Sequence, residues 1–148
     1  MDAVLVTLAA AGLALLAAVA VGTVAHELSH AVVLSALGVP FEIDWLPGRE
    51  DRGLLAAGAT GTWATVSPTR VPGHGAAWRL RAAALTPLVL ATPLALALVG
   101  ALPDPMQSGD PVSQAAAIGW LACAIPSPQD FSLVWYAERA LAERSPRD

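Results

Sequence analysis

Two histidines and a glutamate lie together in the run HELSH, which covers residues 26–30. An α-helix turns about 100° per residue, so residues four apart share a face, and His26 and His30 should point the same way with Glu27 beside them. Imidazole nitrogens are common zinc ligands, and a neighbouring carboxylate can take a proton from water. The spacing therefore predicts two metal ligands and a catalytic glutamate on one helix.

A third metal ligand must come from elsewhere in the chain, because a catalytic zinc site usually has three protein ligands and keeps one position for water. Asp130 is the candidate, since it interrupts an apolar region while the other acidic residues lie in predicted loops or tails. It follows Pro126 and Pro128, and non-helical backbone at membrane depth is tolerated only where protein buries it or it lines a wet cavity. Prolines followed by an acid also favour a helix cap, and the two roles can coexist.

The composition predicts that these residues lie in a membrane protein. Of the 148 residues, 55% are hydrophobic and 14% charged, and the mean hydropathy is +0.58. A spanning helix needs roughly 20 mostly apolar residues. We expect a single membrane-embedded domain over residues 1–148, all-α, with three transmembrane helices over about 4–33, 76–102 and 115–137, the third interrupted by prolines. The first apolar run is about twice as long as a signal-peptide core and lacks a basic leader, so a retained helix is expected.

The charge distribution predicts the orientation in the membrane. Arginines gather around the long loop and in the C-terminal tail, at Arg49, Arg52, Arg70, Arg79 and Arg81 and at Arg139, Arg144 and Arg147. Because cytoplasmic segments carry the excess of basic residues, we expect a multi-pass cell-membrane protein with the N-terminus outside and the loop 38–75 and the C-terminus in the cytoplasm. The first and third helices then both descend toward the cytoplasm and bring His26, His30 and Asp130 to one depth.

The charge and the residue composition bear on the binding partners and on the organism from which the chain comes. A net charge of −4 without clustered basic residues argues against nucleic acid. The single cysteine, Cys123, excludes an internal disulfide and a cysteine-rich zinc site, and we expect it to be a small packing residue. The absence of lysine and the acidic balance hint at a prokaryotic source.

The loop 38–75 is expected to contain a β-hairpin on the cytoplasmic side. Phe41, Ile43 and Trp45 alternate with acidic residues, Pro47–Gly48 marks a turn, and residues 60–66 are rich in β-formers. Two roles stay open for the hairpin: an edge to which an extended substrate adds as a strand, or a cover with no binding role. We expect His74, which lies between glycines in the same loop, to be a solvated histidine rather than a ligand.

Small residues and prolines in the predicted helices bear on packing. Ala10, Ala14, Ala18 and Gly22 recur every four residues, which permits a second helix to approach closely, although an alanine-rich helix presents small residues on every face. The two prolines of the middle helix, Pro87 and Pro93, should bend it, and such prolines are tolerated in membrane helices without any gating role.

These features together resemble the site-two protease family of intramembrane zinc metalloproteases. The order is that of the family: HExxH on a membrane helix, a β-containing loop, a middle helix, and a later segment with prolines and an aspartate. The resemblance implies His26, His30 and Asp130 as zinc ligands and Glu27 as the catalytic glutamate. The run LTPL, residues 85–88, resembles the Gly–Pro motif of the family's middle helix.

The chain departs from the family pattern at positions linked to the substrate rather than to the metal. Phe131 follows the aspartate where the family has glycine, and Thr86 and Leu90 stand where the middle helix usually has Gly and Asn. An Asn ahead of the prolines is also missing, with Ala122 and Cys123 in that neighbourhood. The family's amides are thought to hold the substrate backbone, so these departures concern peptide positioning more than metal binding.

The predicted function is that of a zinc-dependent intramembrane endopeptidase with one Zn²⁺ per chain, cleaving a membrane-embedded protein segment. Glu27 would take the proton of a metal-activated water and return it to the leaving amine. One alternative is a catalytically inactive protein of site-two protease type that binds partner helices. The other is a small membrane subunit without metal. The oligomeric state is not predicted.

Overall fold

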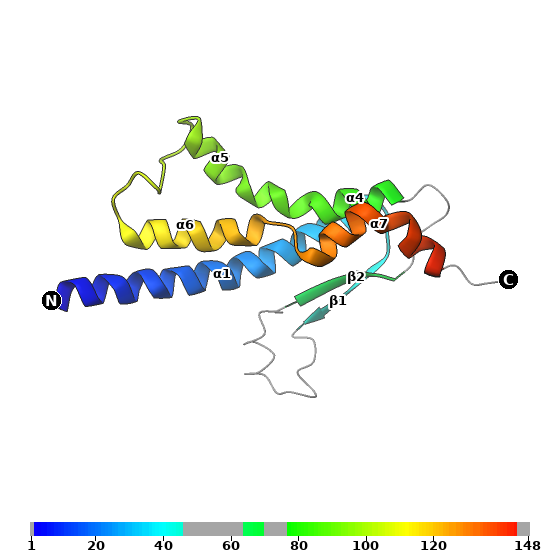
Figure 1. Cartoon of the computed structure of the whole chain (residues 1–148), viewed down its shortest axis with the longest axis horizontal. Coiled ribbons are helices and arrows are strands. Elements are labelled where there is room, and N and C mark those ends of the chain that lie inside the picture. The colour runs from blue at the N-terminus through cyan, green and yellow to red at the C-terminus, as the bar shows by residue number, and fades with distance from the viewer. Residues whose placement is uncertain (1, 46–63, 70–76, 145–148) are drawn as a thin grey trace. The chain divides into compact units, whose positions relative to one another are not determined.

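The computed structural model describes residues 2–45, 64–69 and 77–144. In these ranges the chain is mostly helical, and its elements follow in the order α1 (Asp2–Ala36), β1 (Phe41–Trp45), β2 (Ala64–Pro68), α4 (Ala77–Leu85), the 3-10 helix η1 (Thr86–Ala91), α5 (Thr92–Leu98), α6 (Pro111–Ala124) and α7 (Pro128–Arg144) (Figure 1). Contacts divide the chain into two compact units. The first consists of the chain up to His26 with residues 88–125, and the second of residues 27–87 with the chain from Pro126 onward.

In the first unit, helices α1 and α6 approach closely because small residues face each other. A Cβ placed on Gly119 of α6 would lie 2.8 Å from the carbonyl oxygen of Leu15 and 3.2 Å from the Cβ of Ala18. A Cβ on Gly22 of α1 would lie 2.9 Å from both the Cβ and the Sγ of Cys123. The prediction that the small-residue stripe permits close packing is therefore confirmed at Ala18 and Gly22.

Helix α6 begins with a strong start signal. Asp110 is its N-cap and accepts hydrogen bonds from the backbone N–H groups of Val112 and Ser113, while Pro111 occupies the first turn, where its missing N–H costs nothing. Further along, the indole Nε1 of Trp120 donates to the carbonyl of Leu90 at 2.8 Å. The cap therefore defines the start of α6, and Trp120 ties its C-terminal half to Leu90 within the first unit.

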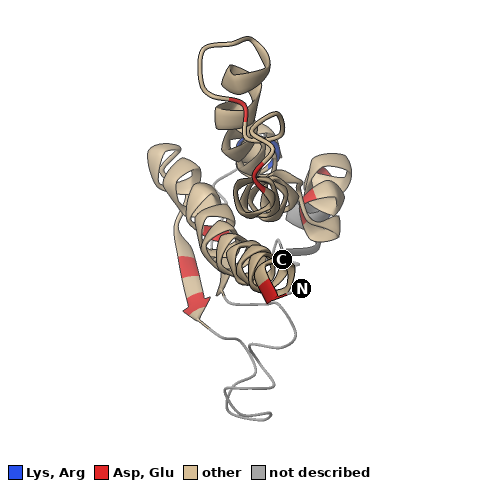
Figure 2. Ribbon diagram, turned by 90° about the vertical axis from the view of Figure 1, so that its left-hand side faces the viewer, with Lys and Arg blue, Asp and Glu red and all other residues tan. Residues whose placement is uncertain are grey.

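Among the described residues, two helical stretches are long and apolar enough to cross a membrane, Asp2–Ala36 and Ala77–Leu98. Large apolar side chains on α1, such as Val6, Leu13 and Val21, are exposed, which is typical of a helix that faces lipid. Figure 2 shows acidic positions at the N-terminal end of α1 and on β1, with no basic position along α1. Two of the three predicted spans are thus supported by length and composition.

The predicted third span, residues 115–137, is divided into α6 and α7 at residues 125–127, as its prolines predicted. Helix α6 has 14 residues and α7 has 17, which is shorter than the roughly 20 residues that a spanning helix needs. A third crossing, and the sidedness of the chain, therefore stay predictions.

The predicted middle helix, residues 76–102, is a succession of α4, η1 and α5 rather than one continuous helix, and α5 ends at Leu98. Pro87 and Pro93 have no N–H to give to the carbonyl four residues earlier, so the α-helical ladder is interrupted there. Gly100 follows with a φ of 76°, the left-handed conformation that commonly ends a helix. The interruption falls at the expected prolines, and the predicted end was too late by a few residues.

In the second unit, α4 packs along α7 (Figure 1). Their shared core contains the C-terminal part of α1 and the residues that follow it, and its buried members are Leu34, Val39, Ala77, Leu80, Ala83 and Ala137. Arg81 of α4 ties α7 in place, because its Nε donates to the carbonyl of Val134 at 3.0 Å and its Nη2 lies 3.3 Å from the Oε1 of Glu138.

The two strands form the antiparallel pair that the sequence predicted. Phe41 is opposite Pro68 and Ile43 is opposite Val66. The second strand was expected over residues 60–66 but is described at Ala64–Pro68, and the predicted turn at residues 47–48 lies outside the described residues, as does His74. The sheet belongs to the second unit.

Candidate metal centre

The three predicted metal ligands come together. His26, His30 and Asp130 each offer one ligand atom, and these atoms all lie within 4.8 Å of one another. All three side chains belong to buried residues, with exposed fractions of 8%, 7% and 7%. Buried polar groups of this kind are retained only when they are hydrogen-bonded, paired or bound to metal. The group could therefore hold a metal ion.

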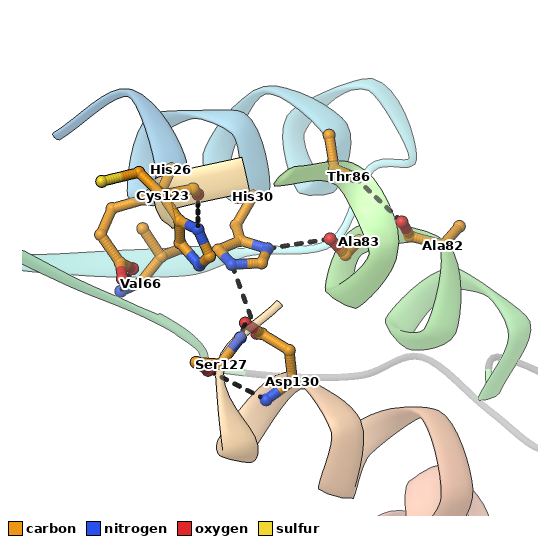
Figure 3. Close-up of polar contacts among 10 residues, drawn as sticks. His26, His30, Val66, Ala82, Ala83, Thr86, Cys123, Ser127 and Asp130 are labelled. Atoms are coloured by element: carbon orange, nitrogen blue, oxygen red, sulfur yellow. Dashed lines mark hydrogen bonds and ion pairs between the residues drawn. The ribbon is translucent and has the colours of Figure 1, made fainter. Parts of the chain in front are cut away.

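The imidazole of His30 is oriented by a main-chain carbonyl. Its Nδ1 lies 2.8 Å from the carbonyl oxygen of Ala83 (Figure 3). A carbonyl oxygen can only accept a hydrogen bond, so Nδ1 carries the proton, and in the neutral ring Nε2 carries the lone pair. This is the arrangement found around histidines that bind metal through Nε2.

The lone-pair side of His30 faces the carboxylate of Asp130. Nε2 and Oδ1 are 3.3 Å apart, and both belong to the second unit. Two electron-rich atoms at this distance repel unless a proton or a metal ion lies between them. Two ligands of a tetrahedral zinc ion lie about 3.4 Å apart when each is about 2.0–2.2 Å from the metal. The observed distance matches that separation.

His26 repeats the arrangement one turn earlier on α1. Its Nδ1 lies 2.7 Å from the carbonyl oxygen of Cys123, so the same reasoning assigns the proton to Nδ1 and the lone pair to Nε2. The carbonyl of Cys123 makes this contact, whereas its sulfur lies 3.5 Å from the carbonyl oxygens of Val19 and Gly119. Cys123 thus combines the expected packing role with an orienting role that its residue type did not predict.

Asp130 serves as helix cap and candidate ligand at once. Its Oδ2 accepts the backbone N–H of Ser127 at 2.7 Å, and its own N–H donates to the Oγ of Ser127 at 3.2 Å. These reciprocal bonds form a capping box at the start of α7, with Pro128 in the first helical position. Because the cap uses Oδ2, Oδ1 points toward His30. The cap role is therefore present, and it is compatible with the ligand role that the sequence also predicted.

Glu27 is directed at the small sheet. Its Oε2 accepts the backbone N–H of Val66 at 3.2 Å. In the antiparallel pair, the N–H of Thr69 donates to the carbonyl of Pro40, so these two residues form a hydrogen-bonded pair. Hydrogen-bonded and non-hydrogen-bonded pairs alternate along such a ladder. Val66, three residues earlier and opposite Ile43, therefore belongs to a non-hydrogen-bonded pair, and its N–H points away from β1. The outer edge of β2 therefore meets the predicted catalytic carboxylate, which is consistent with either of the roles predicted for the hairpin.

The positions that depart from the site-two protease pattern offer no amide side chain. The hydroxyl of Thr86, at the start of η1, donates to the carbonyl of Ala82 in the preceding helix α4 at 2.9 Å. Phe131 is about half exposed, at 45%. Leu90 contributes its carbonyl to Trp120.

Sequence reasoning missed four orienting groups: the carbonyls of Ala83 and Cys123, the N–H of Val66, and the cap residue Ser127, whose N–H holds Oδ2 of Asp130 and whose Oγ accepts the N–H of Asp130. The first three are main-chain groups, which have no signature in residue type. Ser127 was within reach, because Ser-x-x-Asp before a helix is a recognisable capping pattern.

Comparison with known proteins identifies no relative for this chain. It matches no family model, no curated protein and no solved structure. The resemblance to site-two proteases rests on the HELSH run, Asp130 and the order of the elements, and the activity that it implies is a proposal.

Proposed function

We propose that the chain is a zinc-dependent intramembrane endopeptidase of site-two protease type, with one Zn²⁺ held by His26, His30 and Asp130. The observation that carries the proposal is the buried pair of His30 Nε2 and Asp130 Oδ1, 3.3 Å apart, in a ring whose Nδ1 already bonds to Ala83. Two imidazoles and one carboxylate are a donor set that binds zinc and leaves a fourth position for water, as catalytic rather than structural sites do.

Glu27 acts as the general base and acid. When bound, zinc supplies a Lewis acid that polarises the scissile carbonyl and activates water near neutral pH. Glu27 takes a proton from that water and passes it to the leaving amine. The 3.2 Å bond from the N–H of Val66 to Oε2 orients the carboxylate through one of its oxygens, and proton transfer needs only the other.

The substrate is a membrane-embedded segment that unwinds locally, because the peptide bonds of an intact helix are hydrogen-bonded and shielded. Support comes from the position of His26 and His30 on a helix that is apolar and long enough to cross a membrane. Further support comes from the outer edge of β2, whose backbone groups beside Glu27 suit an extended chain.

Cleavage of a model membrane peptide by the purified full chain in detergent tests the proposal. Wild type is expected to cut the peptide, chelation to stop the reaction and added zinc to restore it. Glu27→Gln should lower the rate at least about 100-fold, the typical contribution of a positioned acid–base group, while zinc stays bound. The matched control is Glu42→Gln, which makes the same chemical change at an exposed position of β1 and should leave the rate unchanged.

A second candidate, a metal-binding membrane protein without catalytic activity, is favoured by Thr86 and Phe131. Neither side chain offers an amide to hold a peptide backbone, and the Thr86 hydroxyl donates to the carbonyl of Ala82 in the preceding helix. Zinc binding by wild type with no cleavage in a broad screen of membrane peptides would select this candidate. Protein that binds no zinc would exclude both it and the protease.

A further inference from the structure

Pro87 lies four residues after Ala83, the residue whose carbonyl orients His30. In an α-helix the N–H of residue 87 would donate to the carbonyl of residue 83. Proline has no N–H, so this bond is never made. Helix α4 ends at Leu85 and the tighter helix η1 begins at Thr86, as expected when the next α-helical bond is missing. The carbonyl of Ala83 instead accepts Nδ1–H of His30 at 2.8 Å.

We propose that Pro87 is a positioning residue of the metal centre, which releases the Ala83 carbonyl from the helical ladder so that it fixes His30 with the lone pair on Nε2. The inference rests on the proposed metal site but not on proteolysis. Pro87 itself is almost fully buried, and its side chain contributes no polar group. Its effect is exerted through the carbonyl that it leaves to the histidine.

A related interruption operates on His26, although here the N–H that fails to reach the carbonyl belongs to Ser127 and not to the proline. Helix α6 ends at Ala124, and Pro126 prevents its continuation. The N–H of Ser127, which a continuing helix would direct at the carbonyl of Cys123, donates to Asp130 Oδ2 instead, at 2.7 Å. The Cys123 carbonyl accepts Nδ1–H of His26 at 2.7 Å. In both cases a proline-interrupted helix supplies the carbonyl that sets the histidine tautomer.

The consequence is a ligand set oriented before the metal arrives. Groups that hold the second nitrogen of a metal-binding histidine fix its tautomer and ring orientation, and losing one typically weakens metal affinity 10- to 100-fold. Substituting Pro87 should produce an effect of this size although the residue is not a ligand.

The test compares Pro87→Ala with Pro93→Ala in the full chain in detergent, using zinc competition against a chelator. The Pro87→Ala variant gains an N–H that can close the helical bond to the carbonyl of Ala83, so the zinc dissociation constant should rise about 10-fold or more. Pro93→Ala makes the same chemical change in the first turn of α5. The carbonyl four residues earlier is that of Val89, which is not the one bonded to Nδ1 of either histidine, so this variant should change the constant less than about twofold. Equal affinities of Pro87→Ala and wild type would overturn the proposal.

A second measurement keeps the proposal testable if Pro87→Ala does not fold. The chain has 3 histidines, so ¹⁵N labelling of histidine alone gives few imidazole signals. The signals that disappear in His26→Gln and in His74→Gln identify those two residues, and the remaining signals belong to His30. In metal-free wild type, NMR should show His30 protonated at Nδ1, and a ring protonated mainly at Nε2 would overturn the proposal. Neither readout uses a peptide substrate. If no peptide is cleaved but Pro87→Ala still weakens zinc binding, the proposed protease activity is rejected and this inference stands. If peptide is cleaved but Pro87→Ala does not change zinc affinity, this inference is rejected and the protease activity stands.

Discussion

His30 and Asp130, which lie far apart in the sequence, are joined by a 3.3 Å contact between Nε2 and Oδ1. The Nδ1–H of His30 donates to the carbonyl of Ala83, which orients the ring. The Asp130 carboxylate is oriented by the N–H of Ser127, which donates to Oδ2. Nε2 of His30 and Oδ1 of Asp130 thus face each other. We propose that a shared cation accounts for this arrangement, and the predictions below follow from that proposal and from the elements around it.

Asp130→Asn should abolish zinc binding while the chain stays folded. The amide oxygen of Asn can still accept the N–H of Ser127, so the helix cap is retained, but the negative charge that binds the cation is lost. Zinc per chain should fall from about one to about zero in metal analysis of the purified protein. Asp104→Asn, in an exposed loop, is the control. Retention of one zinc by Asp130→Asn would contradict the assignment of the ligand.

Val66→Pro should slow peptide cleavage about 10-fold without changing zinc affinity, because it removes the N–H that orients Glu27. The sheet should survive, since this N–H points away from β1 and Pro68 already occupies the equivalent position two residues later. Val66→Thr keeps both the N–H and the branched shape and is the matched control. An unchanged cleavage rate in Val66→Pro would show that the contact with Glu27 has no catalytic role.

Gly119→Ala should destabilise the chain by about 1–3 kcal/mol, the usual cost of overpacking. The added Cβ would lie 2.8 Å from the carbonyl oxygen of Leu15, which is backbone and can move only if α1 and α6 separate. At Gly12, on α1, a Cβ meets nothing within 4 Å, so Gly12→Ala should be neutral or stabilising by up to about 1 kcal/mol. Thermal unfolding in detergent compares the two, and equal melting temperatures would exclude close packing of the two helices.

Asp110 should make the start of α6 sensitive to acid. The backbone N–H groups of Ser113 and Val112 hold the pKa of its carboxyl below the ordinary value of 3.8. Because the pKa is lower in the folded chain, the stabilisation is fully present above pH 3.8 and is lost as the pH falls through the lowered value. Asp110→Asn keeps an N-cap acceptor but does not titrate, so it should lose less stability than wild type on acidification. Melting temperatures measured from neutral pH downward provide the check, and parallel curves would contradict the assignment.

Periodicity and residue type predicted the elements of this fold better than their ends. The spacing of His26 and His30, the proline break before Asp130 and the alternation from Phe41 to Trp45 each depend on local sequence, and each feature is present. The middle helix differs from the single helix predicted over residues 76–102 because two prolines divide it. The hydropathy of a segment carries no information about a missing backbone N–H.

The orienting contacts of the site depend on main-chain atoms brought together by tertiary structure. Nothing in the residue types alanine and cysteine indicates that the carbonyls of Ala83 and Cys123 accept histidine protons. The prolines that interrupt the helices were visible in the sequence, but the identity of the group each one releases depends on which histidine packs against it.

X-ray absorption at the zinc edge, on the full chain loaded with one equivalent of zinc, tests the central claim most directly. We expect two imidazole nitrogens at about 2.0–2.1 Å, oxygen ligands at about 2.0–2.2 Å and no sulfur. His30→Ala should remove one imidazole from the spectrum. A sulfur ligand at about 2.3 Å, or a spectrum that His30→Ala leaves unchanged, would contradict a metal centre built from His26, His30 and Asp130.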